Sequence, residues 1–146
     1  MQIRNAEDDD IKDVISLWEH CGLTRPWNDP RSDIALARQT PTSRLMIGVD
    51  EDRIVATALV GCDGHRGWLY YMAVDPDQQG KGLGRRMLHA AEEFVQSQGA
   101  AKLQLMVRTD NTQASGFYQT SGYLAEDAIV FGKRFDGKTW AVRGAE

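Results

Sequence analysis

The sequence has few of the features that mark disulfide-rich, exported or membrane-spanning proteins. Its 146 residues include only two cysteines, Cys21 and Cys62. Two cysteines without a signal peptide do not make a disulfide framework, so we interpret both as reduced thiols. No apolar run approaches the ~18 residues that a membrane span requires, and residues 1–4 begin neither a signal nor a transit peptide. We therefore predict a cytoplasmic protein with no membrane partner.

Positive charge is also scarce. The chain has 17 Lys and Arg against 21 Asp and Glu, a formal net charge of −4, so its surface as a whole repels nucleic acid. Hydrophobic residues make up 42% and charged residues 26%, a balance typical of globular chains that excludes disorder, collagen and coiled coil. At this length we predict a single domain over residues 1–146 and no nucleic-acid partner.

The spacing of apolar residues divides the chain into extended and helical segments. Apolar residues recur at helical spacing over 11–21 and 83–98, and capping residues predict two further helices, from 30 onward and over 111–120. Extended patterns cover 2–4, 45–49, 53–61, 68–75, 102–108 and 123–135, and 136–146 is left unassigned. The run Asp8-Asp9-Asp10 is predicted to supply the N-cap of the first helix, and Asp29-Pro30 to open the second.

A strand, a helix and a second strand follow one another between residues 68 and 107. Strands joined by a helix in this way are parallel, whereas the tight connection at residues 50–52 favours an antiparallel hairpin. We predict an α+β fold with α/β layering, in which a mixed central sheet flanked by helices contains a parallel β-α-β unit.

The segment 74–86 joins the buried strand to the long helix and is rich in glycine. Glycines let a backbone approach a ligand closely, and the N–H groups at a helix N-terminus attract anions, so this turn favours phosphate binding. A dinucleotide G-x-G-x-x-G loop would need glycine at Arg85, and a P-loop would need Ser or Thr at Gly82. The pattern that does fit is Q-x-x-G-x-G, with Gln79 first and Gly84 last.

A purely structural turn is the alternative interpretation of this segment. In that case the glycines only connect the strand to the helix, and Lys81, Arg85 and Arg86 form a solvated charged face.

This motif, its strand and its helix resemble the acetyl-CoA-dependent N-acyltransferases of the GNAT superfamily, whose pyrophosphate-binding signature is [RQ]-x-x-G-x-[GA]. The order of elements over residues 1–135 matches the family, and residues 117–123 resemble its F-Y-x-x-x-G-[FY] segment. The run 17–30 further resembles the bacterial YpeA-like acetyltransferases. The resemblance implies the GNAT fold, acetyl-CoA as co-substrate and an amine as acceptor.

The resemblance also implies roles for individual residues. In the family, the strand before the turn carries a bulge and diverges from the next parallel strand, so its backbone pairs with pantetheine. The cofactor-binding residues implied by position are Met72, Ala73, Val74, Gln79, Gly80, Lys81, Gly82, Leu83, Gly84 and Arg85. Asn111 falls where family members place a side chain against pantetheine, and a plain N-cap is an equal alternative.

Tyr118 matches the general acid of the family. A phenol with an ordinary pKa near 10 stays protonated at neutral pH and can protonate a departing thiolate. An aromatic core residue is the alternative interpretation.

The general base stays unassigned, because the family position of a catalytic glutamate is occupied here by Trp68, which cannot accept a proton. Loop residues that could border the amine site are Asp63, His65, Glu19 and Asp29, each of which is also an ordinary turn residue or surface charge. Cys62 and His65 have C-x-x-H spacing, but no compact second pair accompanies them, so no metal is predicted.

The loop between the first two helices is where this fold closes over the acceptor. Trp27, Asn28 and Asp29 combine an aromatic face with a carboxylate, which favours a cationic amine. Trp27 could instead act as a hydrophobic staple at the next helix start.

We therefore predict an enzyme that transfers acetyl from acetyl-CoA directly to a small-molecule or protein amine in a ternary complex. A non-catalytic CoA-binding or regulatory module on the same fold is the alternative. Trp140 in the tail leaves a homodimer open.

Overall fold

The computed structural model describes residues 1–139, so the tail residue Trp140 lies outside the described range. The chain forms two compact units. The first comprises Met1–Thr24 and Pro30–Met106, and the second comprises Arg25–Asp29 and the described residues from Val107 onward.

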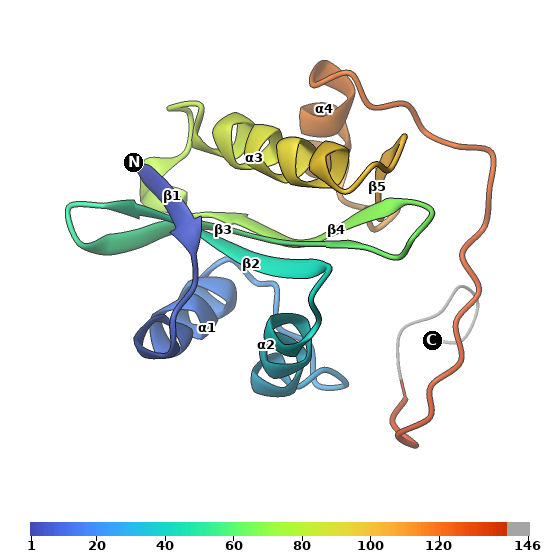
Figure 1. Ribbon diagram of the computed structural model, residues 1–146, viewed down its shortest axis with the longest axis horizontal. Helices are drawn as coiled ribbons and strands as arrows, with labels where there is room; N and C mark the ends of the chain where they lie inside the picture. Colours follow the sequence, from blue (N-terminus) through green and yellow to red (C-terminus); the bar gives the residue numbers. More distant parts are fainter. Residues whose placement is uncertain (140–146) are drawn as a thin grey trace. The chain divides into compact units, whose positions relative to one another are not determined.

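The first unit is built on a five-stranded sheet in the order β1-β2-β3-β4-β5 (Figure 1). Its strands are β1 (Gln2–Asn5), β2 (Ser43–Asp50), β3 (Arg53–Cys62), β4 (Gly67–Val74) and β5 (Leu103–Leu105). Neighbouring strands are antiparallel except β4 and β5, which are parallel. The predicted mixed sheet with one parallel β-α-β unit is therefore confirmed.

Helices cover both faces of this sheet (Figure 1). Helices α1 (Ile11–His20) and α2 (Pro30–Gln39) lie on one face, and α3 (Leu83–Ser97), which connects β4 to β5, lies on the other. Two short 3₁₀ helices, η1 (Asp8–Asp10) and η2 (Pro76–Gln78), precede α1 and follow β4. No helix within residues 1–139 combines the length and the apolar character needed to cross a membrane.

Apolar side chains fill the space between the sheet and each helical layer. On the α1 and α2 face, Trp18 and Ile34 are buried against Ile47 of β2. On the α3 face, Gly67 at the start of β4 lies against Val95, so closely that a Cβ at Gly67 would come within 2.5 Å of a Val95 methyl. The helix–sheet distance at this end of the β-α-β unit therefore depends on the missing side chain.

The turn between β2 and β3 has the geometry that its sequence favours. Asp50 pairs with Arg53, and the two residues between them, Glu51 and Asp52, have φ of 49° and 64°. Positive φ at both positions characterises the two-residue turn whose twist matches antiparallel strands. The predicted hairpin is confirmed.

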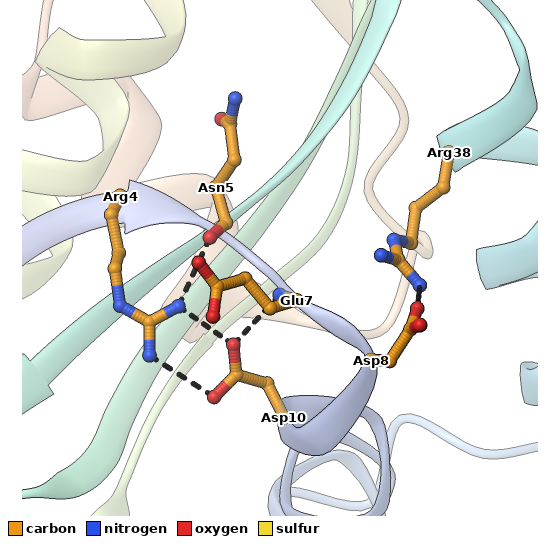
Figure 2. Close-up of polar contacts among 6 residues, drawn as sticks. All are labelled: Arg4, Asn5, Glu7, Asp8, Asp10 and Arg38. Carbon is orange, nitrogen blue, oxygen red and sulfur yellow. Dashed lines mark hydrogen bonds and ion pairs between the residues drawn. The ribbon is translucent and has the colours of Figure 1, made fainter.

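The acidic run before α1 works differently from the prediction. Asp8–Asp10 form η1, and the side chain of Asp10 makes no cap bond to α1. Its carboxylate instead accepts hydrogen bonds from the Arg4 guanidinium at 2.7 and 3.1 Å and from the Glu7 N–H at 2.7 Å (Figure 2). These donors, the Arg4 bond first, lower the pKa of Asp10 below its usual value. The Asp10 carboxylate binds Arg4 of β1 and does not cap α1, so this run connects β1 to α1 through a side-chain contact.

The second unit contains α4 (Thr112–Thr120), which Asn111 precedes as predicted. The predicted final strand over 123–135 is wrong, since the structure has no strand in that range. Leu124, Phe131 and Phe135 are 87%, 91% and 92% exposed. A strand exists only where its N–H and C=O groups pair with a neighbouring strand, and the described part of this unit offers none. The extended character of this segment was therefore insufficient to form one.

Candidate active site

Strand β4 carries a bulge near its C-terminal end. Tyr70 pairs with Leu59 and Ala73 pairs with Thr57, so β4 advances three residues while β3 advances two. One of the bulged residues, Tyr71, has φ of 50°, a left-handed conformation that non-glycine residues rarely adopt. The bulge lies where the family resemblance places it.

The pairing of β4 with its parallel neighbour ends before the bulge. β5 pairs only with Gly67–Leu69, so within the described chain no residue of β5 pairs with Met72–Val74. An edge of this kind presents backbone donors and acceptors to an extended ligand with amide groups. The residues on it are the predicted Met72, Ala73 and Val74.

A network of four side chains surrounds the bulge, one each from α1, α2, β3 and β4. The Trp18 indole N–H donates to the Thr57 hydroxyl at 2.8 Å, and the Thr57 hydroxyl lies 2.8 Å from the Tyr71 carbonyl oxygen. The Tyr71 ring stacks on Trp18 at 3.7 Å between centroids, and its hydroxyl donates to the Asp33 carboxylate at 2.7 Å.

Sequence reasoning missed Thr57, Tyr71 and Asp33 as members of one network. The available signal was Thr57 itself, a hydroxyl residue inside the apolar run of β3, where it is 0% exposed. A buried hydroxyl needs hydrogen-bond partners, but the sequence does not show that they are an indole on α1 and a bulged carbonyl on β4.

The turn after β4 has two glycines in left-handed conformations. Gly80 and Gly82 have φ of 81° and 78°, and a Cβ at either position would meet nothing within 4 Å. Glycine is therefore required by conformation and not by crowding, and the space beside the turn is open.

Gly82 is also the N-cap residue of α3. It has no side chain, so no cap bond satisfies the N–H groups of the first turn of this 15-residue helix. N–H groups at a helix N-terminus, together with the helix dipole, form a site for an anion.

The polar residues of the turn hold its shape. Gln79 donates from its amide to the Val74 carbonyl at 3.4 Å, and Lys81 donates to the Gln78 side chain at 3.0 Å. Asp75, predicted only as a strand end, is buried and accepts the Asp77 N–H at 2.9 Å, which caps η2.

The two arginines at the start of α3 differ in their contacts. Arg86 donates to the Met1 carbonyl at 2.7 Å, which connects α3 to β1. Arg85 is exposed and, with Gly82, lines a surface hollow of about 550 Å³ beside the first turns of α3. Arg85 is therefore available to an anion at the helix start.

Tyr118 lies on α4 in the second unit. Its ring makes edge-on contacts with Phe117 and Tyr123 at centroid distances of 5.0 and 5.8 Å. Partial burial raises the pKa of Tyr118 to about 12, so the phenol holds its proton throughout the ordinary pH range. The side chain of Asn111 accepts the Ala114 N–H at 3.0 Å, which confirms its N-cap role.

The predicted acceptor residues Trp27, Asn28 and Asp29 lie in the same second unit. The Arg134 guanidinium donates to the Trp27 carbonyl and, at 3.4 Å, to the Asn28 side chain. It also pairs with Asp136, whose pKa it lowers. Sequence reasoning missed Arg134, because 106 residues separate it from Asn28.

The candidate bases are surface groups. The Asp63 carboxylate accepts the N–H groups of His65 and Arg66, both at 2.8 Å, and these bonds lower its pKa. Asp63 thus serves the β3–β4 turn, and Glu19 and Asp29 are exposed. Within residues 1–139, both cysteines are free thiols and no group of three metal-ligating side chains is present.

An open strand edge that leads into an uncapped helix N-terminus defines a protein suited to an extended, anionic ligand. The acetyltransferase (GNAT) family model matches residues 11–123 of this chain. An acetyltransferase of Yersinia pestis is 40% identical over 134 residues, which cover 92% of this chain and 95% of that protein.

Two solved structures share the fold. Glucosamine-6-phosphate N-acetyltransferase from Arabidopsis thaliana has a TM-score of 0.72 and 22% identity, with 92% of this chain and 98% of that one covered. AAC(6')-Iy in complex with the bisubstrate analog CoA-S-monomethyl-acetylneamine has a TM-score of 0.78 and 15% identity, with 91% of this chain and 97% of that one covered. At these identities the likeness concerns the fold alone.

The chain therefore belongs to the acetyltransferase (GNAT) family. The family and the fold predicted from the glycine turn, the element order and the 117–123 segment are both confirmed. The predicted class of enzyme, an acetyltransferase, is confirmed at the level of the family as well.

Proposed function

We propose that this enzyme transfers the acetyl group of acetyl-CoA directly to an amine while both substrates are bound. The observation that carries the proposal is the bulged end of β4, where β5 no longer pairs with Met72–Val74, leading into the glycine turn at the start of α3. A thioester arm can pair along such an edge while its diphosphate reaches the helix N-terminus.

The cofactor would be held mainly by backbone groups. The diphosphate would lie on the N–H groups of the turn from Gln79 to Gly84, with Arg85 beside it. The Val74 carbonyl already accepts the Gln79 amide and, at 3.5 Å, the Cys21 thiol. Any contact of Val74 with pantetheine would therefore use its N–H. Met72 would supply the remaining backbone contacts, because the N–H and C=O of Ala73 face its partner Thr57 on β3.

The chemistry needs no covalent enzyme intermediate. A neutral amine attacks the thioester carbon, the C–N bond forms, the C–S bond breaks, and the amine loses one proton to water or a base. The departing thiolate takes a proton from Tyr118, which regains it from solvent. The raised pKa keeps Tyr118 in the required protonated form. Asn111 can contribute its amide N–H₂ to pantetheine while its oxygen caps α4.

The acceptor would be a primary amine that is cationic in solution, on a small molecule or a protein. Family neighbours named for aminoglycosides and for glucosamine-6-phosphate support an amine on a polar small molecule. In this chain Trp27, Asn28 and Asp29 would receive it, through the indole face and the carboxylate. The cytoplasmic location and a homodimer stay predictions.

A non-catalytic CoA-binding module is the second candidate. Trp68 favours it, because this residue occupies the position at which several family members carry their base. An amine that arrives neutral, or a chain of waters, would remove the need for a carboxylate there.

A thiol-release screen separates the two candidates. Purified protein with acetyl-CoA is offered amino sugars, aminoglycosides, polyamines and lysine-containing peptides, and free CoA thiol is measured against a Gly82→Glu control. Turnover with any amine above that control supports the enzyme. CoA binding by calorimetry without turnover on any acceptor supports the module.

A further inference from the structure

We propose that Thr57 is a positioning residue for acetyl transfer. Its hydroxyl holds the Tyr71–Met72 peptide so that the Met72 N–H points at the thioester oxygen. The inference rests on the proposed function, because it assumes that acetyl-CoA lies along the open edge of β4.

The argument begins with the peptide bond that follows Tyr71. This bond is trans, and in a planar trans peptide the C=O and the following N–H point in opposite directions. The Tyr71 oxygen lies 2.8 Å from the Thr57 hydroxyl on β3. The Met72 N–H is therefore directed away from Thr57, toward the side on which β5 no longer pairs with β4.

The direction of the hydroxyl hydrogen follows from its other partner. An indole N–H only donates, so at 2.8 Å from the Trp18 nitrogen the Thr57 oxygen acts as acceptor. The hydroxyl hydrogen is thus left to the Tyr71 carbonyl. Because Thr57 is 0% exposed, no water competes for these positions, and each bond polarises the next.

The rest of the network keeps Tyr71 in its unusual conformation. The ring is stacked on Trp18 with 6° between the planes, and the hydroxyl is bound to Asp33 on α2. A left-handed non-glycine residue persists only where its surroundings determine it, and such residues gather at functional sites. Here the side chain is fixed at two points, and Thr57 fixes the carbonyl that the side chain does not reach.

A purely structural role is the competing explanation. Thr57 would then only satisfy the buried indole N–H of Trp18, and its loss would lower stability without changing how a bound thioester is polarised. The two roles differ in what happens to the carbonyl of bound acetyl-CoA.

Infrared difference spectroscopy of acetyl-CoA labelled with ¹³C at the thioester carbonyl measures this directly and needs no acceptor. A hydrogen bond to the carbonyl oxygen lowers its stretching frequency. The key variant is Thr57→Val, which keeps the shape and deletes the hydroxyl, and Thr57→Ser restores the hydroxyl. The matched control is Val55→Ala, which truncates a buried residue of the same strand that takes part in none of the three hydrogen bonds of the network.

We expect the band of bound acetyl-CoA to lie below that of the free thioester in the wild type, in Thr57→Ser and in Val55→Ala. In Thr57→Val it should return toward the free position while the Kd for acetyl-CoA stays within about twofold. With an acceptor from the screen, kcat should fall about tenfold and both KM values should hold, a smaller loss than removal of an oxyanion donor itself causes. If Thr57→Val does not fold, Thr57→Ala, which also deletes the hydroxyl, should shift the band in the same direction.

An unchanged band in a folded Thr57→Val would overturn the inference. An unshifted band in wild-type protein that binds acetyl-CoA would do the same, since no N–H would then reach the thioester. If acetyl-CoA does not bind at all, the proposed function itself fails.

Discussion

The two units of this chain are stabilised in different ways. In the first, a five-stranded ladder, two helical layers and a buried hydrogen-bonded network around Tyr71 fix strand β4. In the second, the nine-residue helix α4 has no buried residue, and the segment after it exposes Phe131 and Phe135. Local stability follows burial and backbone pairing, so the second unit should open more readily.

This difference separates two tasks. The proposed cofactor contacts come from backbone that the fold fixes in advance, which suits a ligand that every turnover uses. The proposed acid and acceptor residues, Tyr118 and Trp27, come from the less stable unit, where adaptation to an acceptor is easier. Four substitutions test whether the division holds.

The largest effect is expected from Gly82→Glu in the first unit. A carboxylate at the N-terminus of α3 repels a diphosphate, so CoA binding should fall by about a hundredfold or more, as measured by calorimetry. The matched control is Gly82→Ala, which shares the cost of a side chain at φ 78°, roughly 1–2 kcal/mol, but adds no charge. Equal CoA affinity in both folded variants would remove the anion site from this turn.

Tyr118→Phe should leave CoA affinity and melting temperature intact and lower turnover by about 10²-fold, because only the proton of the leaving group is lost. The pH profile adds a second test. With a pKa of about 12, Tyr118 should contribute no alkaline limb below about pH 11, so the profiles of the wild type and of Tyr118→Phe should differ in height and not in shape there. Turnover within about twofold of the wild type, when chemistry limits the rate, would show that Tyr118 is not the acid.

Trp27→Ala should raise the acceptor KM by about tenfold and leave the acetyl-CoA KM unchanged, the loss expected for a desolvated cation–π contact. Steady-state kinetics and a thermal melt are compared with Leu124→Ala, which truncates an exposed apolar residue of the same unit. A lower melting temperature with both KM values unchanged would assign Trp27 a packing role instead.

Asp10→Asn should lower the free energy of unfolding by only about 1 kcal/mol at pH 7, because the Arg4–Asp10 pair is partly exposed. The folded-state pKa of Asp10 is depressed, so its stabilisation is present above the unfolded pKa of about 3.9 and is lost as pH falls through the folded value. Urea unfolding at pH 7, 5 and 3 should therefore show the gap between wild type and variant narrowing only at the acid end. Asp9→Asn, an exposed neighbour, provides the control, and an equal gap at all three pH values would contradict the pairing.

The sequence predicted the first unit better than the second. Local signals defined the first unit: the Asp29-Pro30 helix start, the tight turn at residues 50–52 and the glycine turn all act over a few neighbouring residues. The network of Trp18, Thr57 and Asp33 around the bulge could not be predicted, because its members are far apart in sequence and their types are unremarkable. In the second unit, the pattern over 123–135 indicated a strand, but a strand depends on a partner that local residues do not specify.

The contact between Gly67 and Val95 has a consequence for redesign of this fold. The bare α-carbon of Gly67 allows α3 to rest directly on β4, and these two elements diverge from the same glycine turn. A methyl group at residue 67 would act as a wedge at the far end of the β4–α3 pair, whereas a Val95→Ala replacement would vacate the volume that the methyl needs. Residues 67 and 95 thus set the helix–strand distance by their combined volume, which is kept only if both are exchanged together. A graft of this glycine turn onto another scaffold must therefore carry both residues with it.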